Sequence, residues 1–284
     1  MKRVADIVLT EMVEAHDRWD SSLVISLGEQ AEADLAIIDF PLKKRVQIEL
    51  LEMMARAFSR TAQCSKAMSS FEQLLSLFDP IEKHREYTRT QLRIADMCNI
   101  LRDFGKAKVL YEVVHAAGER DGNFEYHSKA CLGLCRIEKA TGNKNDAMEL
   151  AKQALIAADL MMDGDFGKER DAAQAIICIL EFSDITSENF NETLLTRLEQ
   201  LATEVDANED GGSSLCVKAA EIQWHREFAM SRWSQCANAC AKTMRLASQT
   251  RFNQNPEVKA VYKRALQTVQ NLNILGYIAI NPET

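Results

Sequence analysis

The sequence predicts an all-α protein made of repeated pairs of antiparallel helices. Glycine (11) and proline (4) are scarce among the 284 residues. This composition favours long helices with short connections over the many turns of a β-sandwich or barrel. Alanines also recur every forty residues, at Ala67, Ala107 and Ala147. A fixed period of this length is typical of stacked helical repeats.

Residues of matched size surround these three alanines. The small residues Ala55, Ala95 and Cys135 each follow a large apolar residue, and further apolar positions follow the alanines at Phe71, Tyr111, Ala151, Leu74, Val114 and Ala154. Small residues allow neighbouring helices to approach closely, and stacked helix pairs bury a core that no single pair could bury. The turn-forming stretches 102–105 and 141–144 divide two of the repeats into their helices.

Two stretches of this pattern resemble the tetratricopeptide repeat (TPR) family. They are Leu134-Cys135, like the family's first helix, and Gly142 with Ala147, Ala151 and Ala154, like its second. The forty-residue period exceeds the family's usual length of about 34 residues. It is similar to the longer-repeat branch that includes LGN/Pins, rapsyn and bacterial peptide-sensing regulators. The resemblance implies a right-handed superhelical α-solenoid whose first helices line a concave, protein-binding groove.

The resemblance covers residues 48–160 and departs from the family at several positions. The aromatic residue of the first helix is present as Phe58, but Cys98 and Glu138 stand there in the next two repeats. The closing proline is approximated only by Pro80.

We expect one solenoid domain over residues 1–284. Trp19 and Trp233 stand where Phe104 stands in its turn, which extends the pattern to both ends of the chain, and Pro256 can open a last helix. The expected repeats are 3–40, 48–80, 88–120, 128–160, 168–206 and 213–250, followed by a capping helix over 256–272.

Charge and cysteine usage limit the class of protein. The net charge of −8 and the pI of about 5.3 argue against nucleic-acid binding. The sequence has neither a signal-peptide core nor an apolar run near the ~18 residues of a membrane span. Eight cysteines without a secretory signal indicate reduced thiols, so we expect a cytoplasmic protein.

The sequence shows no recognisable catalytic or metal-binding motif. His127, Cys131 and Cys135 follow one another at successive turns of one helix, but the eight residues from the first to the last span about 12 Å, too far for one ion. Cys236 and Cys240 fit core positions, and the Asp163-Gly164-Asp165 stretch lacks the remaining ligands of a calcium loop. We therefore expect no enzyme activity, no metal and no cofactor.

Cationic residues repeat along the first helices of repeats two to four. They are Arg56, Arg60, Arg89, Arg93, Lys129, Arg136 and Lys139. Both arginine pairs have i, i+4 spacing, so each presents two guanidiniums on one helix face, and guanidiniums bind carboxylates bidentately. The alternative is an ordinary solvated face neutralised by Glu49, Glu52 and Asp96.

These features predict a non-catalytic scaffold or adaptor that binds an acidic peptide or helix in its groove. One alternative is a peptide- or ligand-responsive regulator. Another is a subunit domain of a larger complex or enzyme, for which the apolar stretch 274–280 is a candidate interface with a further domain or a second copy.

Overall fold

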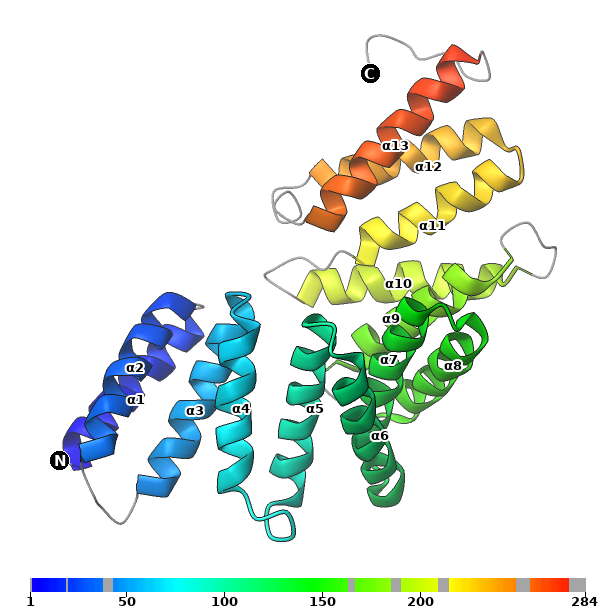
Figure 1. Ribbon diagram of the computed structural model, residues 1–284. Coiled ribbons are helices and arrows are strands. Elements are labelled where there is room, and N and C mark those ends of the chain that lie inside the picture. The colour runs from blue at the N-terminus through cyan, green and yellow to red at the C-terminus, as the bar shows by residue number, and fades with distance from the viewer. Residues whose placement is uncertain are drawn as a thin grey trace. The chain divides into compact units, whose positions relative to one another are not determined.

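The computed structural model describes residues 2–18, 20–37, 43–162, 167–184, 190–208, 215–248 and 256–275. These ranges contain thirteen helices and no strand, which confirms the all-α prediction (Figure 1). The helices are α1 (Lys2–Asp17), α2 (Ser21–Ile37), α3 (Lys43–Arg60), α4 (Cys64–Leu77), α5 (His84–Ile100), α6 (Phe104–Asp121), α7 (Phe124–Thr141), α8 (Lys144–Leu160), α9 (Lys168–Phe182), α10 (Glu192–Asn208), α11 (Leu215–Ala229), α12 (Trp233–Ser248) and α13 (Pro256–Ile274). Trp19, the 163–165 stretch and the tail after residue 275 lie outside the described residues.

The chain forms two compact units, residues 1–137 and 138–284, and the division falls within α7. In the first unit each helix from α1 to α6 packs against the next, and α1 also packs against α3. In the second unit the same holds from α8 to α13, with added contacts of α11 to α9 and to α13. Odd-numbered helices, which we call A helices, thus also contact other A helices. This is the packing expected of stacked helix pairs.

The residues that define the forty-residue pattern are buried. Ala67, Ala107 and Ala147 are fully inaccessible, and so are Ala55, Ala95 and Cys135. The large positions beside and after them, Met54, Ile94, Leu134, Phe71, Tyr111, Leu74 and Val114, are also buried. The sequence periodicity therefore marks the core of the repeats.

Tyr111 is the largest fully buried side chain of the first unit, and Gly133 makes room for it. A Cβ atom on Gly133 would lie 2.3 Å from the Tyr111 ring, so α7 can rest against this ring only without a side chain there. The phenol donates a 2.7 Å hydrogen bond to Asp96 Oδ1 on α5. Burial and the nearby Asp96 both raise the pKa of Tyr111, which keeps the hydroxyl protonated as a donor.

The tight turns between helices share one backbone conformation. Ala62, Arg102 and Gly142 lie forty residues apart, and each has a positive φ, of 58°, 62° and 88° respectively. The residue after each one donates its N–H to the carbonyl five positions back, as Asp103 does to Cys98 at 2.9 Å. This is the Schellman motif, in which glycine is favoured at the left-handed position.

We expect Arg102→Gly to raise the free energy of unfolding by about 0.5–1 kcal/mol, because an L-residue is strained in this conformation and glycine is not. Gly142→Ala, the reverse change at the equivalent turn, should lower it by a similar amount. Urea denaturation of both variants measures the two shifts. A loss of stability in Arg102→Gly would contradict this account of the turn.

No helix in the described part of the chain combines the length and the apolar character needed to cross a membrane.

Candidate interaction surface

Arginines from α3 and α5 meet at one carboxylate. Arg56 Nη2 lies 2.5 Å from Glu52 Oε1, one turn away on α3. Arg89 Nη2, on α5, lies 2.9 Å from the same oxygen. Two guanidiniums therefore share one negative charge, so positive charge remains in excess around Glu52.

Arg60 and Arg93 extend this positive region by one helical turn on each helix. Both side chains are exposed. Burial and the charge of Arg56 lower the pKa of Arg60, so the two guanidiniums of α3 lie close enough to repel each other. We call Arg56, Arg60, Arg89 and Arg93, with Glu52 between them, the arginine surface.

The cations predicted on α7 are placed differently. Lys129 forms an ion pair with Glu125, one turn earlier on its own helix. Arg136 is exposed on the same helix. Lys139 belongs to the second unit, where it pairs with Glu181 on α9. The structure thus brings Arg56 and Arg89 together, whereas Lys129 and Lys139 have acidic partners of their own.

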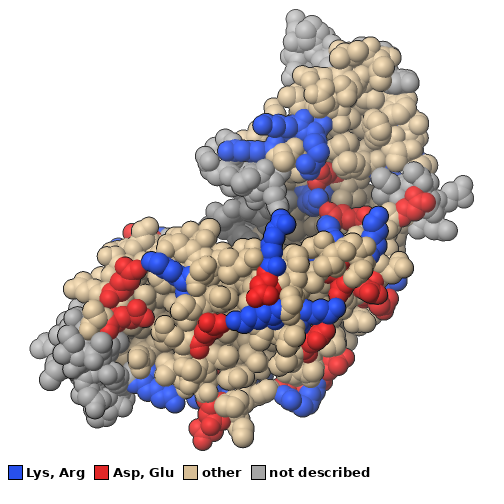
Figure 2. All heavy atoms as spheres, in the orientation of Figure 1, with Lys and Arg blue, Asp and Glu red and all other residues tan. Residues whose placement is uncertain are grey.

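In the second unit Lys139 begins a series of ion pairs that crosses four A helices. Lys218 Nζ on α11 lies 2.9 Å from Glu181 Oε1 and 3.0 Å from Glu221 Oε2. Arg264 on α13 completes the series with a 2.5 Å contact to Glu221 Oε1. We call Lys139, Glu181, Lys218, Glu221 and Arg264 the ion-pair ladder. Acidic and basic side chains also lie beside one another on the face in Figure 2.

Glu221 is the buried centre of this ladder, with 5% of its side chain exposed. Burial raises the pKa of this carboxyl, but His225, 3.9 Å away, and the hydrogen bonds from Arg264 and Lys218 outweigh burial and lower it to about 2. Glu221 is therefore ionised at neutral pH and holds three neighbouring side chains.

No protein-family model matches the sequence, and no curated protein does. Among solved structures, the chain is similar to the apo form of RapI with a TM-score of 0.61 at 10% identity, covering 94% of this chain and 99% of that one. A putative kinesin light chain from Podosopora anserina with nearly identical TPR-like repeats has a TM-score of 0.47 at 16% sequence identity, and the match covers 75% of this chain and 99% of that one. The TPR domain of P58(IPK) has a TM-score of 0.36 at 11% sequence identity, and the match covers 95% of this chain and 66% of that one.

The chain has a TPR-like fold. The predicted fold class is thereby confirmed, and at these identities the likeness concerns the fold alone. In TPR terms the arginine surface lies on the A helices of the second and third repeats, at α3 and α5.

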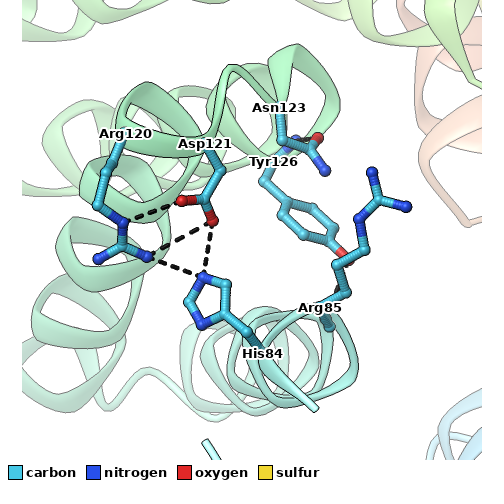
Figure 3. Close-up of polar contacts among 6 residues, drawn as sticks. All are labelled: His84, Arg85, Arg120, Asp121, Asn123 and Tyr126. Atoms are coloured by element: carbon cyan, nitrogen blue, oxygen red, sulfur yellow. Dashed lines mark hydrogen bonds and ion pairs between the residues drawn. The ribbon is translucent and has the colours of Figure 1, made fainter. Parts of the chain in front are cut away.

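One further arginine of this TPR-like chain lies beside the arginine surface and was not among the predicted residues. Arg85 lies one turn before Arg89 on α5 and is exposed. Its backbone carbonyl accepts a 3.1 Å hydrogen bond from the Tyr126 hydroxyl (Figure 3). Burial and Glu125 raise the pKa of Tyr126, and the charges of Arg89 and Arg85 oppose this shift, so both guanidiniums lie near the phenol. The i, i+4 spacing from Arg89 was the available signal.

A neighbouring polar cluster links α5 to α6. His84 Nε2 lies 2.7 Å from Asp121 Oδ2 and 2.8 Å from Arg120 Nη2 (Figure 3). A hydrogen bond from Arg120 is the main cause that lowers the pKa of Asp121. The cluster joins side chains that are 36 and 37 residues apart in sequence, so it fixes the start of α5 to the end of α6.

Within the described residues, one group has the side chains and spacing for a metal ion: His115, His127 and Cys131. His127 and Cys131 share their helix with Cys135, whereas His115 comes from α6. His115 lies six residues before the end of α6 at Asp121, and His127 lies three residues after the start of α7 at Phe124. Their nearness to this short turn was the signal that the sequence offered.

Proposed function

We propose that the chain is a non-catalytic protein-binding scaffold whose arginine surface receives an acidic segment of a partner. The observation that carries the proposal is the sharing of Glu52 by Arg56 and Arg89, with exposed Arg60 and Arg93 beside them. Solenoid repeats present extended surfaces on which a partner segment is held by many modest contacts. The helical repeats provide this surface, and its arginines favour partner segments that carry acidic residues.

The chemistry of the guanidinium group favours carboxylates as the partner's binding groups. Its planar fork of N–H donors matches a carboxylate, and the i, i+4 spacing places two forks on one face of each helix. The net charge of the chain is −8, so a local excess of arginine contrasts with the rest of the molecule. Glu52 occupies the position that a partner carboxylate would take between Arg56 and Arg89.

Charge reversal tests this proposal directly. We expect Arg89→Glu combined with Arg93→Glu to weaken binding of a short fluorescein-labelled polyglutamate peptide at least tenfold, about 1.4 kcal/mol, in fluorescence anisotropy. The matched control is Lys144→Glu with Lys152→Glu, which changes the net charge equally at exposed positions on α8. If both double variants lost affinity for the peptide equally, the effect would come from the net charge alone and the proposal would be overturned.

Glu52→Gln provides the opposite test. This change removes the internal carboxylate that competes for Arg56 and Arg89 and keeps the size of the side chain. The same peptide should then bind several times more tightly than to the unaltered chain. An unchanged or weaker affinity would show that the peptide does not use these two guanidiniums.

A further inference from the structure

The end of α6 and the start of α7 lie unusually close together because Gly118 has no side chain. A Cβ atom there would lie 2.7 Å from the backbone nitrogen of His127. Asn123, in the connecting turn, donates its N–H to the carbonyl of Gly118 at 2.9 Å, which holds the approach in place. The two helices therefore present side chains to each other at short range on either side of this contact.

Two pairs of potential metal ligands face each other across this contact. His115 and Glu119 have i, i+4 spacing on α6, and His127 and Cys131 have the same spacing on α7. The imidazole rings of His115 and His127 have centroids 4.4 Å apart, and ligand atoms of His115, His127 and Cys131 all lie within 4.8 Å of one another. Glu119 Oε2 lies 3.8 Å from His115 Nδ1.

These distances suit a tetrahedral zinc ion after small side-chain rotations. Zinc binds nitrogen at about 2.0–2.1 Å and sulfur at about 2.3 Å, so its ligand atoms lie roughly 3.3–3.6 Å apart. The separations between the ligand atoms of His115, His127 and Cys131 are at most 4.8 Å, and that between His115 and Glu119 is 3.8 Å, so side-chain rotations need to close at most about 1.5 Å. Cys131 is fully buried and His115 is 23% exposed, so the thiol is shielded from solvent and the His115 imidazole is the solvent-facing side of the cluster.

We propose that His115, His127 and Cys131 bind Zn²⁺, with the Glu119 carboxylate as the fourth ligand. Imidazole, thiolate and carboxylate are all established zinc ligands, and the mixed set favours zinc over the hard cations Mg²⁺ and Ca²⁺. Because the ligands come in pairs from α6 and α7, the ion would clamp two consecutive repeats at their junction. Unlike the set His127, Cys131 and Cys135, whose spacing along one helix excludes a single ion, this site takes its ligands from two helices.

Cobalt substitution tests the site spectroscopically on the full chain. Co²⁺ should produce a thiolate-to-cobalt charge-transfer band in the near ultraviolet and the visible bands of a tetrahedral centre, and Zn²⁺ should abolish both. We expect Cys131→Ala to lose the charge-transfer band. Cys135→Ala, one turn further along α7, should keep it, and alanine already stands at the equivalent positions 55 and 95.

His115→Gln is a second test in case Cys131→Ala, a change at a buried position, does not fold. His115 is partly exposed, so its replacement disturbs the packing less. This change should weaken zinc affinity at least tenfold, and it should remove the rise in melting temperature that Zn²⁺ gives the unaltered chain. Circular dichroism verifies that the helical content is retained. Absence of a thiolate band in the unaltered chain, or an equal band in Cys131→Ala, would overturn the proposal.

Discussion

Replacing Gly133 with alanine is expected to lower the free energy of unfolding of the first unit by about 1–3 kcal/mol, the usual cost of overfilling a packed core. The new Cβ atom would lie 2.3 Å from the ring of Tyr111. Tyr111 has no free space into which to move, because it is fully buried and its hydroxyl is bonded to Asp96. The strain must therefore shift α7 away from α6.

Hydrogen exchange of the amides in α5, α6 and α7 reports this loss locally. The control is Gly105→Ala, because a Cβ atom at Gly105 meets nothing nearer than 4.0 Å. That variant should keep the protection of the unaltered chain or slightly exceed it, since alanine is the better helix former. Equal protection in Gly133→Ala and Gly105→Ala would mean that Gly133 does not serve to accommodate the tyrosine.

Glu221→Ala is expected to destabilise the second unit by about 2–3 kcal/mol. Removing one partner from a buried ion pair costs about 3–5 kcal/mol, and the partial exposure of Lys218 and Arg264 reduces that figure. Urea unfolding followed by tryptophan fluorescence, to which Trp224 and Trp233 contribute from the second unit and Trp19 from the first, measures the change. Glu199→Ala, which breaks the more exposed pair with Lys242, should cost less than about 1 kcal/mol.

The contribution of Glu221 should also depend on pH. Its pKa is lowered from 4.5 to about 2 in the folded chain, so the unfolded chain takes up the proton first as the pH falls. The stabilisation is therefore complete above about pH 5 and is lost as the pH falls toward 2. The difference in urea midpoint between the unaltered chain and Glu221→Gln should shrink over this range. A difference that stayed constant with pH would contradict the ionic role of Glu221.

The helical-repeat fold could be predicted because its core is periodic in the sequence. Ala67, Ala107 and Ala147 are fully buried, and small residues recur at such positions because they let neighbouring helices approach closely. The turns are harder to predict from the sequence. Of the three turns that lie forty residues apart, the one at Gly142 shows the left-handed conformation by its residue type, whereas Ala62 and Arg102 adopt it despite theirs.

The interaction surface was only partly predictable, because its electrostatics depend on pairs between repeats. Glu52 was recognised as a possible neutralising partner, but its place between Arg56 and Arg89 requires the relative position of α3 and α5. Lys139 was predicted to face the groove from its place in the repeat, but its ion pair with Glu181, 42 residues away in sequence, could not be predicted. The positions of the repeats beyond residue 160 were inferred from fewer matching residues, so Glu181 could not be placed beside Lys139 from the sequence.

The zinc-ligand cluster was missed for a related reason. Cysteine and histidine spacing along one helix is easy to read, whereas His115 joins His127 only across the junction of α6 and α7. The small residue that permits this approach, Gly118, carries no metal signal of its own.

Affinity capture with mass spectrometry tests the central claim most directly, that the arginine surface binds acidic segments of other proteins. The baits are the unaltered chain, the Arg89→Glu/Arg93→Glu variant and the Lys144→Glu/Lys152→Glu control. We predict a set of proteins with acidic segments that the unaltered chain and the control both retain and the arginine variant loses. The same proteins captured in equal amounts by all three baits would contradict the claim.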